Sequence, residues 1–192
     1  MPQLRSPAAV VAIILAGFGL YLFSQGIYIH AKAVVAQVLL RQAFVQTIAT
    51  GKPVKPWAWA DTWPVAKIDV PRLGAQTIVL AGASGQALAF GPGHVSNTKL
   101  PGQSGTAIFA AHRDTHFQFL GELKIGDEIQ VTRNDGQEFS YRVFDMKVTH
   151  WDHNGIDVNS AGKTLVLATC WPLNSQVPGD QRYLVYADLD EN

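Results

Sequence analysis

The chain begins with a long apolar segment that contains no charged side chain. From Ala8 to Ile29 there is no Asp, Glu, Lys, Arg or His, and from Ala8 to Phe23 every residue is apolar or glycine. A helix over this segment reaches about 33 Å at about 1.5 Å per residue, which is enough to cross a hydrocarbon core of about 30 Å. Because so long a run without a polar face does not suit a buried helix of a soluble domain, the sequence predicts a membrane-spanning anchor.

Two features bear on how this segment is used. Ala31-Lys32-Ala33 matches the small-residue pattern of a signal-peptidase site, so a cleaved signal peptide is the alternative to a retained anchor. The apolar run is longer than a usual signal core, which favours the anchor. Its short N-terminal flank favours an N-terminus in the cytoplasm. We therefore expect a single-pass protein of the inner or cytoplasmic membrane, with the bulk of the chain on the outer (periplasmic) face.

The remainder of the chain, roughly 160 residues, suits one domain with one substantial core. The chain has 15 Lys and Arg against 15 Asp and Glu, so no basic field predicts nucleic-acid binding. We expect three parts. They are a cytoplasmic stub and transmembrane anchor at residues 1–30, a juxtamembrane helix and linker at 31–62, and a folded domain at 63–192.

The segment that follows the anchor changes character twice. Apolar residues recur over Ala31–Thr50 at a spacing that mostly suits one helical face, which predicts a juxtamembrane helix. The run Gly51-Lys52-Pro53-Val54-Lys55-Pro56 then breaks the pattern. Three tryptophans follow, at Trp57, Trp59 and Trp63, and they suit either the bilayer interface or packing of the linker onto the domain.

Beyond Trp63 the chain consists of short apolar segments separated by turn-forming residues, as at Asn134-Asp135-Gly136. These segments predict seven strands: Val65–Val70, Thr77–Leu80, Thr106–Ala111, Glu128–Thr132, Glu138–Val148, Thr164–Thr169 and Tyr183–Ala187. Two brief helices are predicted at Ser84–Phe90, which opens with a capping serine, and at Thr115–Leu123. Seven or eight short strands with few helices indicate a mainly β domain, as either a closed barrel or a sandwich.

Cys170 is the single cysteine of the chain, and it ends the apolar, strand-forming run Thr164–Cys170. It therefore has no partner for an internal disulfide. Outside the cytoplasm an unpaired cysteine tends to be oxidised or to cross-link, so a cysteine kept at a strand terminus indicates a nucleophile. The alternative is a buried core cysteine, since free cysteines are often buried.

Two further reactive side chains stand at strand boundaries. The strand Thr106–Ala111 runs into His112, and Arg182 opens the last strand. Three strands can thus bring a thiol, an imidazole and a guanidinium together. In acyl transfer a thiolate attacks, an imidazole moves the proton, and a guanidinium stabilises an oxyanion or holds the substrate. Because His and Arg also occur at strand ends by chance, the spacing alone leaves this function open.

Three segments together resemble the signature stretches of the sortase family of cysteine transpeptidases. They are His112–Phe117, Leu167–Cys170 and Arg182, which lies twelve residues after the cysteine. The resemblance extends over roughly Trp63 to Leu189 and so covers nearly the whole domain. Within the family, the chain is most similar to the class D-like and Gram-negative-type sortases.

The resemblance implies a closed eight-stranded barrel with a defined set of reacting groups. Cys170 is expected to be the nucleophile, His112 the general acid and base, and Arg182 the clamp for the oxyanion or the substrate. The chain departs from the family pattern at Ala111, where glycine is frequent, and at Val166, where threonine or a similar residue is frequent. Neither position is a reacting group, so these departures affect the subclass and leave the chemistry unchanged.

Three further residues are weaker candidates for substrate binding or the oxyanion site. Thr169, just before the cysteine, is expected to shape the oxyanion site through its hydroxyl or its backbone. His94 could line the groove, with a loop histidine bonded to backbone as the alternative. Asp114 could orient the ring of His112 as the third member of a triad does, with capping of the following helix as the alternative.

The resemblance also implies the partners. They are a secreted protein that carries a C-terminal sorting signal similar to L-P-x-T-G, an amine acceptor on the cell envelope, and the lipid bilayer. The enzyme would cleave the signal before its glycine, hold the product as a thioester on the cysteine, and transfer it to the amine. Two alternatives stay open: a cysteine peptidase that resolves the same thioester with water, and a non-enzymatic, membrane-tethered β-module with an inert cysteine.

Two groups of residues raise the question of a metal. His150 and His153 form a conceivable zinc pair, but the sequence shows no third ligand at a suitable spacing. Glu122, Asp127 and Glu128 raise calcium, but their arrangement matches no dedicated calcium loop. We therefore expect no metal and no cofactor.

Overall fold

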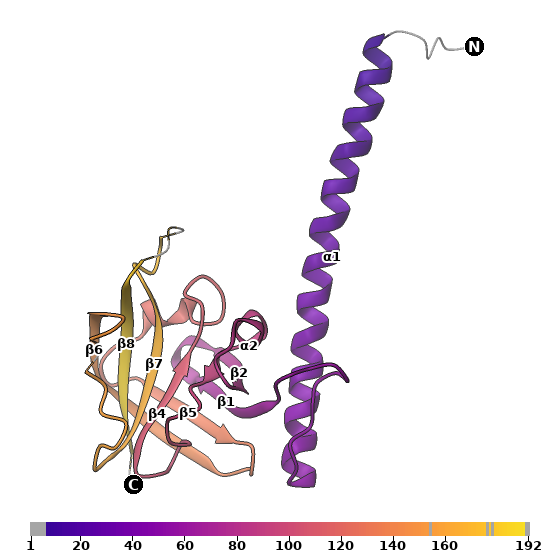
Figure 1. Cartoon of the computed structure of the whole chain (residues 1–192). Helices are drawn as coiled ribbons and strands as arrows, with labels where there is room; N and C mark the ends of the chain where they lie inside the picture. The colour runs from indigo at the N-terminus through magenta and orange to yellow at the C-terminus, as the bar shows by residue number, and fades with distance from the viewer. Residues whose placement is uncertain (1–6, 154, 176, 178, 191–192) are drawn as a thin grey trace. The chain divides into compact units, whose positions relative to one another are not determined.

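The computed structural model describes residues 7–190 except 154, 176 and 178. It consists of a long helix, α1 (Pro7–Thr50), and a closed barrel of eight strands (Figure 1). The chain divides into two compact units between Val38 and Leu39, so the C-terminal end of α1 belongs to the unit that contains the barrel. The mainly β barrel that the sequence predicts is thereby confirmed.

The eight strands follow the chain from residue 64 to residue 189. They are β1 (Pro64–Val70), β2 (Ala75–Ala81), β3 (Gly93–His94), β4 (Gly105–Ala110), β5 (Glu128–Arg133), β6 (Glu138–His150), β7 (Lys163–Trp171) and β8 (Gln181–Leu189). Their order around the barrel is β1-β2-β3-β4-β7-β8-β6-β5, and β5 closes the ring on β1. Two pairs, β2–β3 and β4–β7, are parallel and the others are antiparallel.

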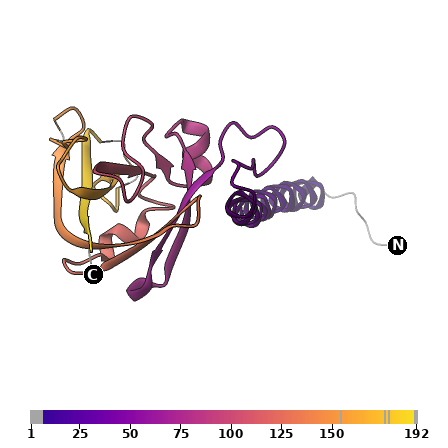
Figure 2. The same cartoon turned by 90° about the horizontal axis from the view of Figure 1, so that it is seen from below.

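Helix α1 is continuous over 44 residues, and both views show it as one unbroken rod (Figures 1 and 2). The boundary that the sequence suggested near residue 30 therefore does not interrupt the helix. The large apolar side chains from Val10 to Tyr28 are exposed. By length and composition, this is a helix that can cross a membrane or serve as a signal sequence.

The C-terminal end of α1 packs onto the barrel. Leu40 and Phe44 are buried in a cluster with β2 and the short helix α2 (Gly85–Phe90). The Oγ1 atom of Thr47 accepts a hydrogen bond of 3.0 Å from the backbone N–H of Val54, which holds the start of the linker against the helix. These contacts fix the last turns of α1 within the second unit.

All seven strands that the sequence predicts are present, and β3 is the strand that it misses. The two residues of β3 follow Pro92, whose carbonyl accepts a 2.7 Å hydrogen bond from the N–H of Leu80 in β2. A Cβ atom at Gly93 would lie 2.2 Å from the carbonyl oxygen of Gly82, so only glycine allows this close approach. In the sequence, Gly93 reads as part of a turn. In the structure, it is the residue that permits β3 to pair with β2.

Of the two helices predicted within the domain, one is confirmed and one is shorter than expected. Ser84 caps α2 by accepting a hydrogen bond of 3.3 Å from the N–H of Ala87. The helix predicted over Thr115–Leu123 is only a 3-10 turn, η2 (Gln118–Glu122), while a second such turn, η1 (Pro71–Leu73), links β1 to β2. Phe117 and Leu120 are fully buried in the core, and this anchoring favours a compact turn over a regular helix.

Side chains of β4, β7 and β8 alternate between the inside of the barrel and its outer surface, as the period of two in a strand requires. The inward set includes Phe109, Leu167 and Val185, and the outward set includes Ile108, Val166 and Leu184. Loop residues such as Ile156 and Val158 cover the outward set. This alternation determines whether a side chain at the end of one of these strands points into the core or outward.

Leu167 tests the packing of the barrel core. Its side chain is fully buried in β7, so Leu167→Ala is expected to lower the free energy of unfolding by about 2–5 kcal/mol. Urea titration of the full chain in detergent, followed by tryptophan fluorescence, measures this loss. The matched control is Val148→Ala in β6, where the side chain is 40% exposed. Equal losses in the two variants would contradict the proposed core.

Asp127 tests an ion pair between η1 and the residue before β5. Arg72 donates two hydrogen bonds of 2.6 Å to its carboxylate, and the N–H of Lys124 donates a third of 2.7 Å. The bonds from Arg72 hold the pKa of Asp127 below its ordinary value, although burial opposes this. The ionised form is therefore the one that stabilises the fold. Its contribution is complete above the ordinary carboxyl pKa of about 3.9 and is lost as the pH falls through the lower folded value.

Asp127→Asn is accordingly expected to lower the melting temperature most at neutral pH. The difference from the wild type should shrink in acid, because protonation removes the same interaction from the wild type. Melting curves of both proteins from pH 7 down to pH 2 measure it. A difference in melting temperature between the two proteins that stays constant over this pH range would show that the ion pair makes no pH-dependent contribution to stability.

Candidate active site

His112 and Cys170 follow neighbouring parallel strands. Ala110 at the end of β4 lies opposite Ala168 in β7, and the N–H of Ala111 donates a hydrogen bond of 3.2 Å to the carbonyl of Ala168. His112 and Cys170 each come two residues after the last paired residue. Because parallel strands run in the same direction, both side chains stand at the same end of the barrel wall.

Arg182 joins them from the other side of β7. In the antiparallel β7–β8 ladder, Cys170 lies directly opposite Arg182 without any shift of register. Residues directly opposite in such a ladder have Cβ atoms about 4.5–5.5 Å apart on the same face of the sheet. The thiol and the guanidinium therefore extend from neighbouring backbone positions in one direction.

The alternation along the strands also assigns a face to Cys170 and Arg182. Phe109, Leu167 and Val185 point into the core, so the even-numbered positions of β4, β7 and β8 point outward. Cys170 and Arg182 therefore both point outward. Ala111, the residue before His112, is buried in the core, and His112 itself is exposed. The three strands beside or within which these residues lie, β4, β7 and β8, are neighbours in the barrel (Figure 1).

The surroundings leave these groups open to a ligand. His112 is exposed, while Cys170 and Arg182 are half-buried. The Nη1 atom of Arg182 donates to the carbonyls of Gly179 and Gln181 at 3.1 and 2.9 Å. Among the described residues, no acceptor is bonded to Nη2 or Nε. An open depression of about 580 Å³ lies beside Arg182. Its lining consists of Trp151, Gly179, Asp180 and Arg182.

Thr169 lies on the opposite face from the thiol. Its side chain is buried, and its hydroxyl donates a hydrogen bond of 2.7 Å to the carbonyl of Ala111. The hydroxyl is therefore engaged in joining the end of β7 to the residue before His112. A part for Thr169 at an oxyanion site, if carried by its backbone, stays a prediction.

Arg113 has a structural role that the sequence did not reveal. Its side chain is buried, and Nη2 donates a hydrogen bond of 2.7 Å to the carbonyl of Val177 in the β7–β8 connection. Among the described residues, Nη1 has no hydrogen-bond partner. Arg113 thus ties the segment that carries His112 to the loop between Cys170 and Arg182. In the sequence, only its position next to His112 points to Arg113, because its partner Val177 lies 64 residues away.

His94 is held within the barrel wall. It is buried in β3, where Nε2 lies 2.9 Å from the carbonyl oxygen of Lys99 and 3.1 Å from the hydroxyl of Thr98. Burial lowers the pKa of His94, and the bond to Lys99 partly opposes this. These contacts match the structural alternative, a loop histidine bonded to backbone. A role in substrate binding remains a prediction without a contact that supports it.

Asp114 and His116 flank the segment after His112. Asp114 is exposed, and its role in orienting the ring of His112 stays a prediction. His116 is half-buried, and its ring lies near the backbone of Ala89 in α2. Burial is the main cause that lowers the pKa of His116, and the nearby His112 lowers it further. His116 therefore packs this segment against α2.

The structure changes the picture of both candidate metal groups. The Asp127 carboxylate is occupied by Arg72 and by the N–H of Lys124, which leaves it poorly placed for calcium. The expectation that His150 and His153 lack a third ligand is wrong. Asp152, which stands between the two histidines in the sequence, turns its carboxylate toward both rings.

The three groups at the barrel end suit acyl transfer. A half-buried thiol, an exposed imidazole and a half-buried guanidinium can supply a nucleophile, a proton carrier and an anion-stabilising group.

Comparison with known proteins points in the same direction. A family model described as a sortase domain matches residues 68–190. Sortase D of Bacillus subtilis is 28% identical over 120 residues, which make up 62% of this chain and 60% of that protein. The chain thus matches less than two thirds of the length of this curated relative.

Solved structures share the fold. A sortase D transpeptidase of Clostridium perfringens superposes with a TM-score of 0.66 at 24% identity, over 82% of this chain and 99% of that one. A mutant form of sortase E from Streptomyces avermitilis has a TM-score of 0.56 at 32% identity, over 66% of this chain and 87% of that one. The barrel is therefore the one these proteins have.

Thr169→Val tests the link between β7 and the His112 segment. Valine keeps the shape of threonine but removes the donor to the buried carbonyl of Ala111, so the loss of stability is expected to be about 1–3 kcal/mol. Amide exchange measured by mass spectrometry should also become faster in peptides that contain His112. Thr169→Ser keeps the hydroxyl and is expected to leave that exchange rate close to the wild type. Equal acceleration in both variants would refute a specific role for the hydroxyl.

Proposed function

Since the chain belongs to the sortase family, whose members are transpeptidases, we propose that it is a membrane-anchored cysteine transpeptidase. Its substrate is a secreted protein with a C-terminal sorting signal similar to L-P-x-T-G, and its acceptor is an amine on the cell envelope. One observation carries this proposal: Cys170 lies directly opposite Arg182 in the β7–β8 ladder, and His112 follows the end of β4, the parallel neighbour of β7. The family match alone does not identify the reacting groups.

In the first half of the reaction, the Cys170 thiolate attacks the carbonyl carbon before the glycine of the signal. A C–S bond forms, and negative charge develops on the carbonyl oxygen. Arg182 is the group placed to stabilise this charge, because it lies directly across the strand pair from the cysteine. His112 gives a proton to the leaving amine as the C–N bond breaks, and the product remains as a thioester on Cys170.

In the second half, the acceptor amine attacks the thioester. His112, now without its proton, accepts one from the attacking amine, and the thiolate of Cys170 leaves. A new amide bond joins the secreted protein to the acceptor. The exposure of His112 and the partial exposure of Cys170 and Arg182 support this proposal, since one amine must depart and another must enter at the same place.

The apolar part of α1 supports the anchoring. It is the one helix in the described residues that is long and apolar enough to cross a membrane, and its side chains are not buried by the rest of the protein. In the proposed arrangement, the N-terminus lies in the cytoplasm and the barrel lies on the outer face of the inner or cytoplasmic membrane. A substrate that has just been secreted reaches the enzyme on that face.

The test uses the full chain in detergent, a peptide that contains the L-P-x-T-G motif, and a primary amine. Mass spectrometry of the wild type is expected to show a thioacyl adduct on Cys170, and the adduct should be absent in Cys170→Ala. His112→Ala and Arg182→Ala are each expected to lower kcat/KM by about 100-fold or more. Arg142→Ala is the matched control, because Arg142 is an exposed arginine of β6 that pairs with Asp190.

Two outcomes would contradict the proposal. A Cys170→Ala variant that still converts the peptide would exclude the cysteine as the nucleophile. A wild type that yields only hydrolysed peptide at every amine concentration would identify a peptidase in place of a transpeptidase. Ligated product that increases with the amine concentration supports transfer.

A further inference from the structure

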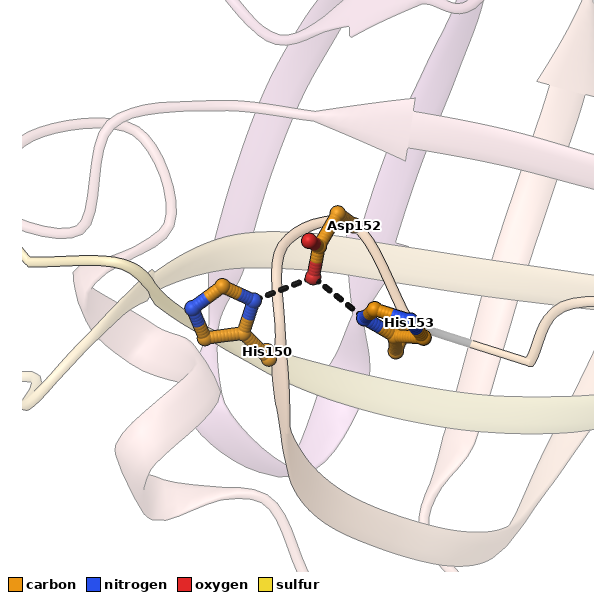
Figure 3. A group of neighbouring side chains, drawn as sticks. All are labelled: His150, Asp152 and His153. Atoms are coloured by element: carbon orange, nitrogen blue, oxygen red, sulfur yellow. Dashed lines mark hydrogen bonds and ion pairs between the residues drawn. The ribbon is translucent and has the colours of Figure 1, made fainter.

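A compact cluster of metal-ligating side chains lies where β6 ends. His150 is the last residue of β6, and the turn that follows it carries Asp152 and His153. One carboxylate oxygen, Oδ1 of Asp152, is bonded to Nδ1 of His150 and lies 2.6 Å from Nδ1 of His153 (Figure 3). The three donor atoms lie within 4.8 Å of one another. No residue of this cluster takes part in the proposed acyl transfer.

These donors match the preferences of zinc. Zn²⁺ binds imidazole nitrogen at about 2.0–2.1 Å and carboxylate oxygen at about 2.0–2.2 Å, usually with four ligands in a tetrahedron. Donors on one such ion lie roughly 3–4 Å apart, so small side-chain rotations bring the three atoms onto it. The three side chains leave the fourth position to water. All three are exposed, so an ion can enter from solvent.

A carboxylate behind His150 strengthens the match. Nε2 of His150 lies 3.1 Å from Oδ2 of Asp180, which belongs to the β7–β8 connection. Histidines that bind a metal through one ring nitrogen commonly donate the N–H of the other to a carboxylate, which fixes the tautomer and the ring orientation. Asp180 is placed to do this for His150. Nδ1 of His150 is then the nitrogen left for the ion.

The backbone holds the ligands together before any ion binds. The hydroxyl of Thr149 donates to the carbonyl of His153 at 2.9 Å, and the N–H of His153 donates to the carbonyl of His150 at 3.3 Å. The N–H of Trp151 donates to the carbonyl of Asp180 at 2.8 Å. These bonds close the turn and attach it to the β7–β8 connection, so little ordering is left for the ion to impose.

The charges favour a divalent cation. Within the described part of the chain, the ion pairs of Asp152 and Asp180 are with histidines only. With neutral imidazoles, the cluster carries two negative charges, and neither carboxylate forms an ion pair with a lysine or arginine among the described residues. A dication compensates both, whereas protons do so only when the histidines are charged.

We infer that His150, Asp152 and His153 form a binding site for Zn²⁺ or a similar divalent transition-metal ion, with Asp180 as the residue that positions His150. The ion joins the turn after β6 to the β7–β8 connection. Asp180 lies between Gly179 and Gln181, whose carbonyls hold the guanidinium of Arg182. The site is therefore next to the backbone that supports the candidate active-site arginine, although binding of the ion does not depend on the proposed function.

The test measures metal binding by the full chain in detergent, made without a histidine tag and stripped of metal. Calorimetric titration with Zn²⁺ is expected to show one ion per chain. Asp180→Asn, which removes a positioning carboxylate, should weaken the affinity about 10–100-fold, and His153→Gln should weaken it at least as much. Asp61→Asn is the charge-matched control for Asp180→Asn, because Asp61 is an exposed aspartate outside the cluster, and it should bind as the wild type does.

Titration with Co²⁺ gives a second measurement, the visible absorption of the bound ion. A cluster with a purely structural role would not produce this absorption. The visible absorption of bound Co²⁺ should appear in the wild type and in Asp61→Asn, and it should be lost in His153→Gln. Absence of saturable Zn²⁺ binding by the wild type, or equal binding by His153→Gln, would overturn the inference and leave a metal-free cluster of His–Asp ion pairs. Because no substrate is present, failure here is distinct from failure of the proposed acyl transfer.

Discussion

The hydrogen-bond register around β7 is the constraint on which the candidate site depends. This strand pairs in parallel with β4 and antiparallel with β8. The first pairing brings the end of β4, two residues before His112, to the end at which β7 carries its cysteine, and the second places Arg182 directly across from that cysteine. A shift of either register by one residue would turn a reacting group to the other face. The buried, inward-facing Leu167 and Val185 oppose such a shift, so the core fixes the site.

The connection between β7 and β8 depends on the same arrangement. It joins the end of β7, which carries Cys170, to the start of β8, which carries Arg182, and its described residues contact two other parts of the protein. Arg113 donates to the carbonyl of Val177 on one side, and Asp180 meets His150 on the other. One attachment joins the connection to the histidine segment and the other joins it to the end of β6. The positions of the two reacting groups that flank it are therefore coupled to both neighbouring loops.

Much of the fold follows from local sequence patterns. The apolar run before residue 30 predicts the long helix, and alternating short segments predict seven of the eight strands. The elements that the sequence did not predict correctly depend on contacts between side chains or backbone groups of different segments. The strand at Gly93 exists because a backbone without Cβ can approach Gly82, and the segment around Phe117 is a turn because its aromatic ring is anchored in the core.

The candidate site shows the same division. Cys170, His112 and Arg182 were identified from their places at strand ends together with a family resemblance, and the register gathers them. Arg113 and Asp180 were missed, because each acts on a partner about 30 or more residues away and no local pattern records such a contact. Asp152 was missed for a different reason: a carboxylate between two histidines looks like part of a solvated loop until the turn brings its oxygen to both rings.

The most direct measurement is a crystal structure of the chain with an L-P-x-T-G-like peptide captured on Cys170 by a thiol-reactive group in place of the scissile bond. The account predicts that the peptide lies on the outer face of β4, β7 and β8. His112 should be within hydrogen-bond reach of the leaving-group position, and a guanidinium N–H of Arg182 should lie within reach of the carbonyl oxygen or the peptide backbone. A captured peptide that contacts neither residue, or that lies at the opposite end of the barrel, would contradict it.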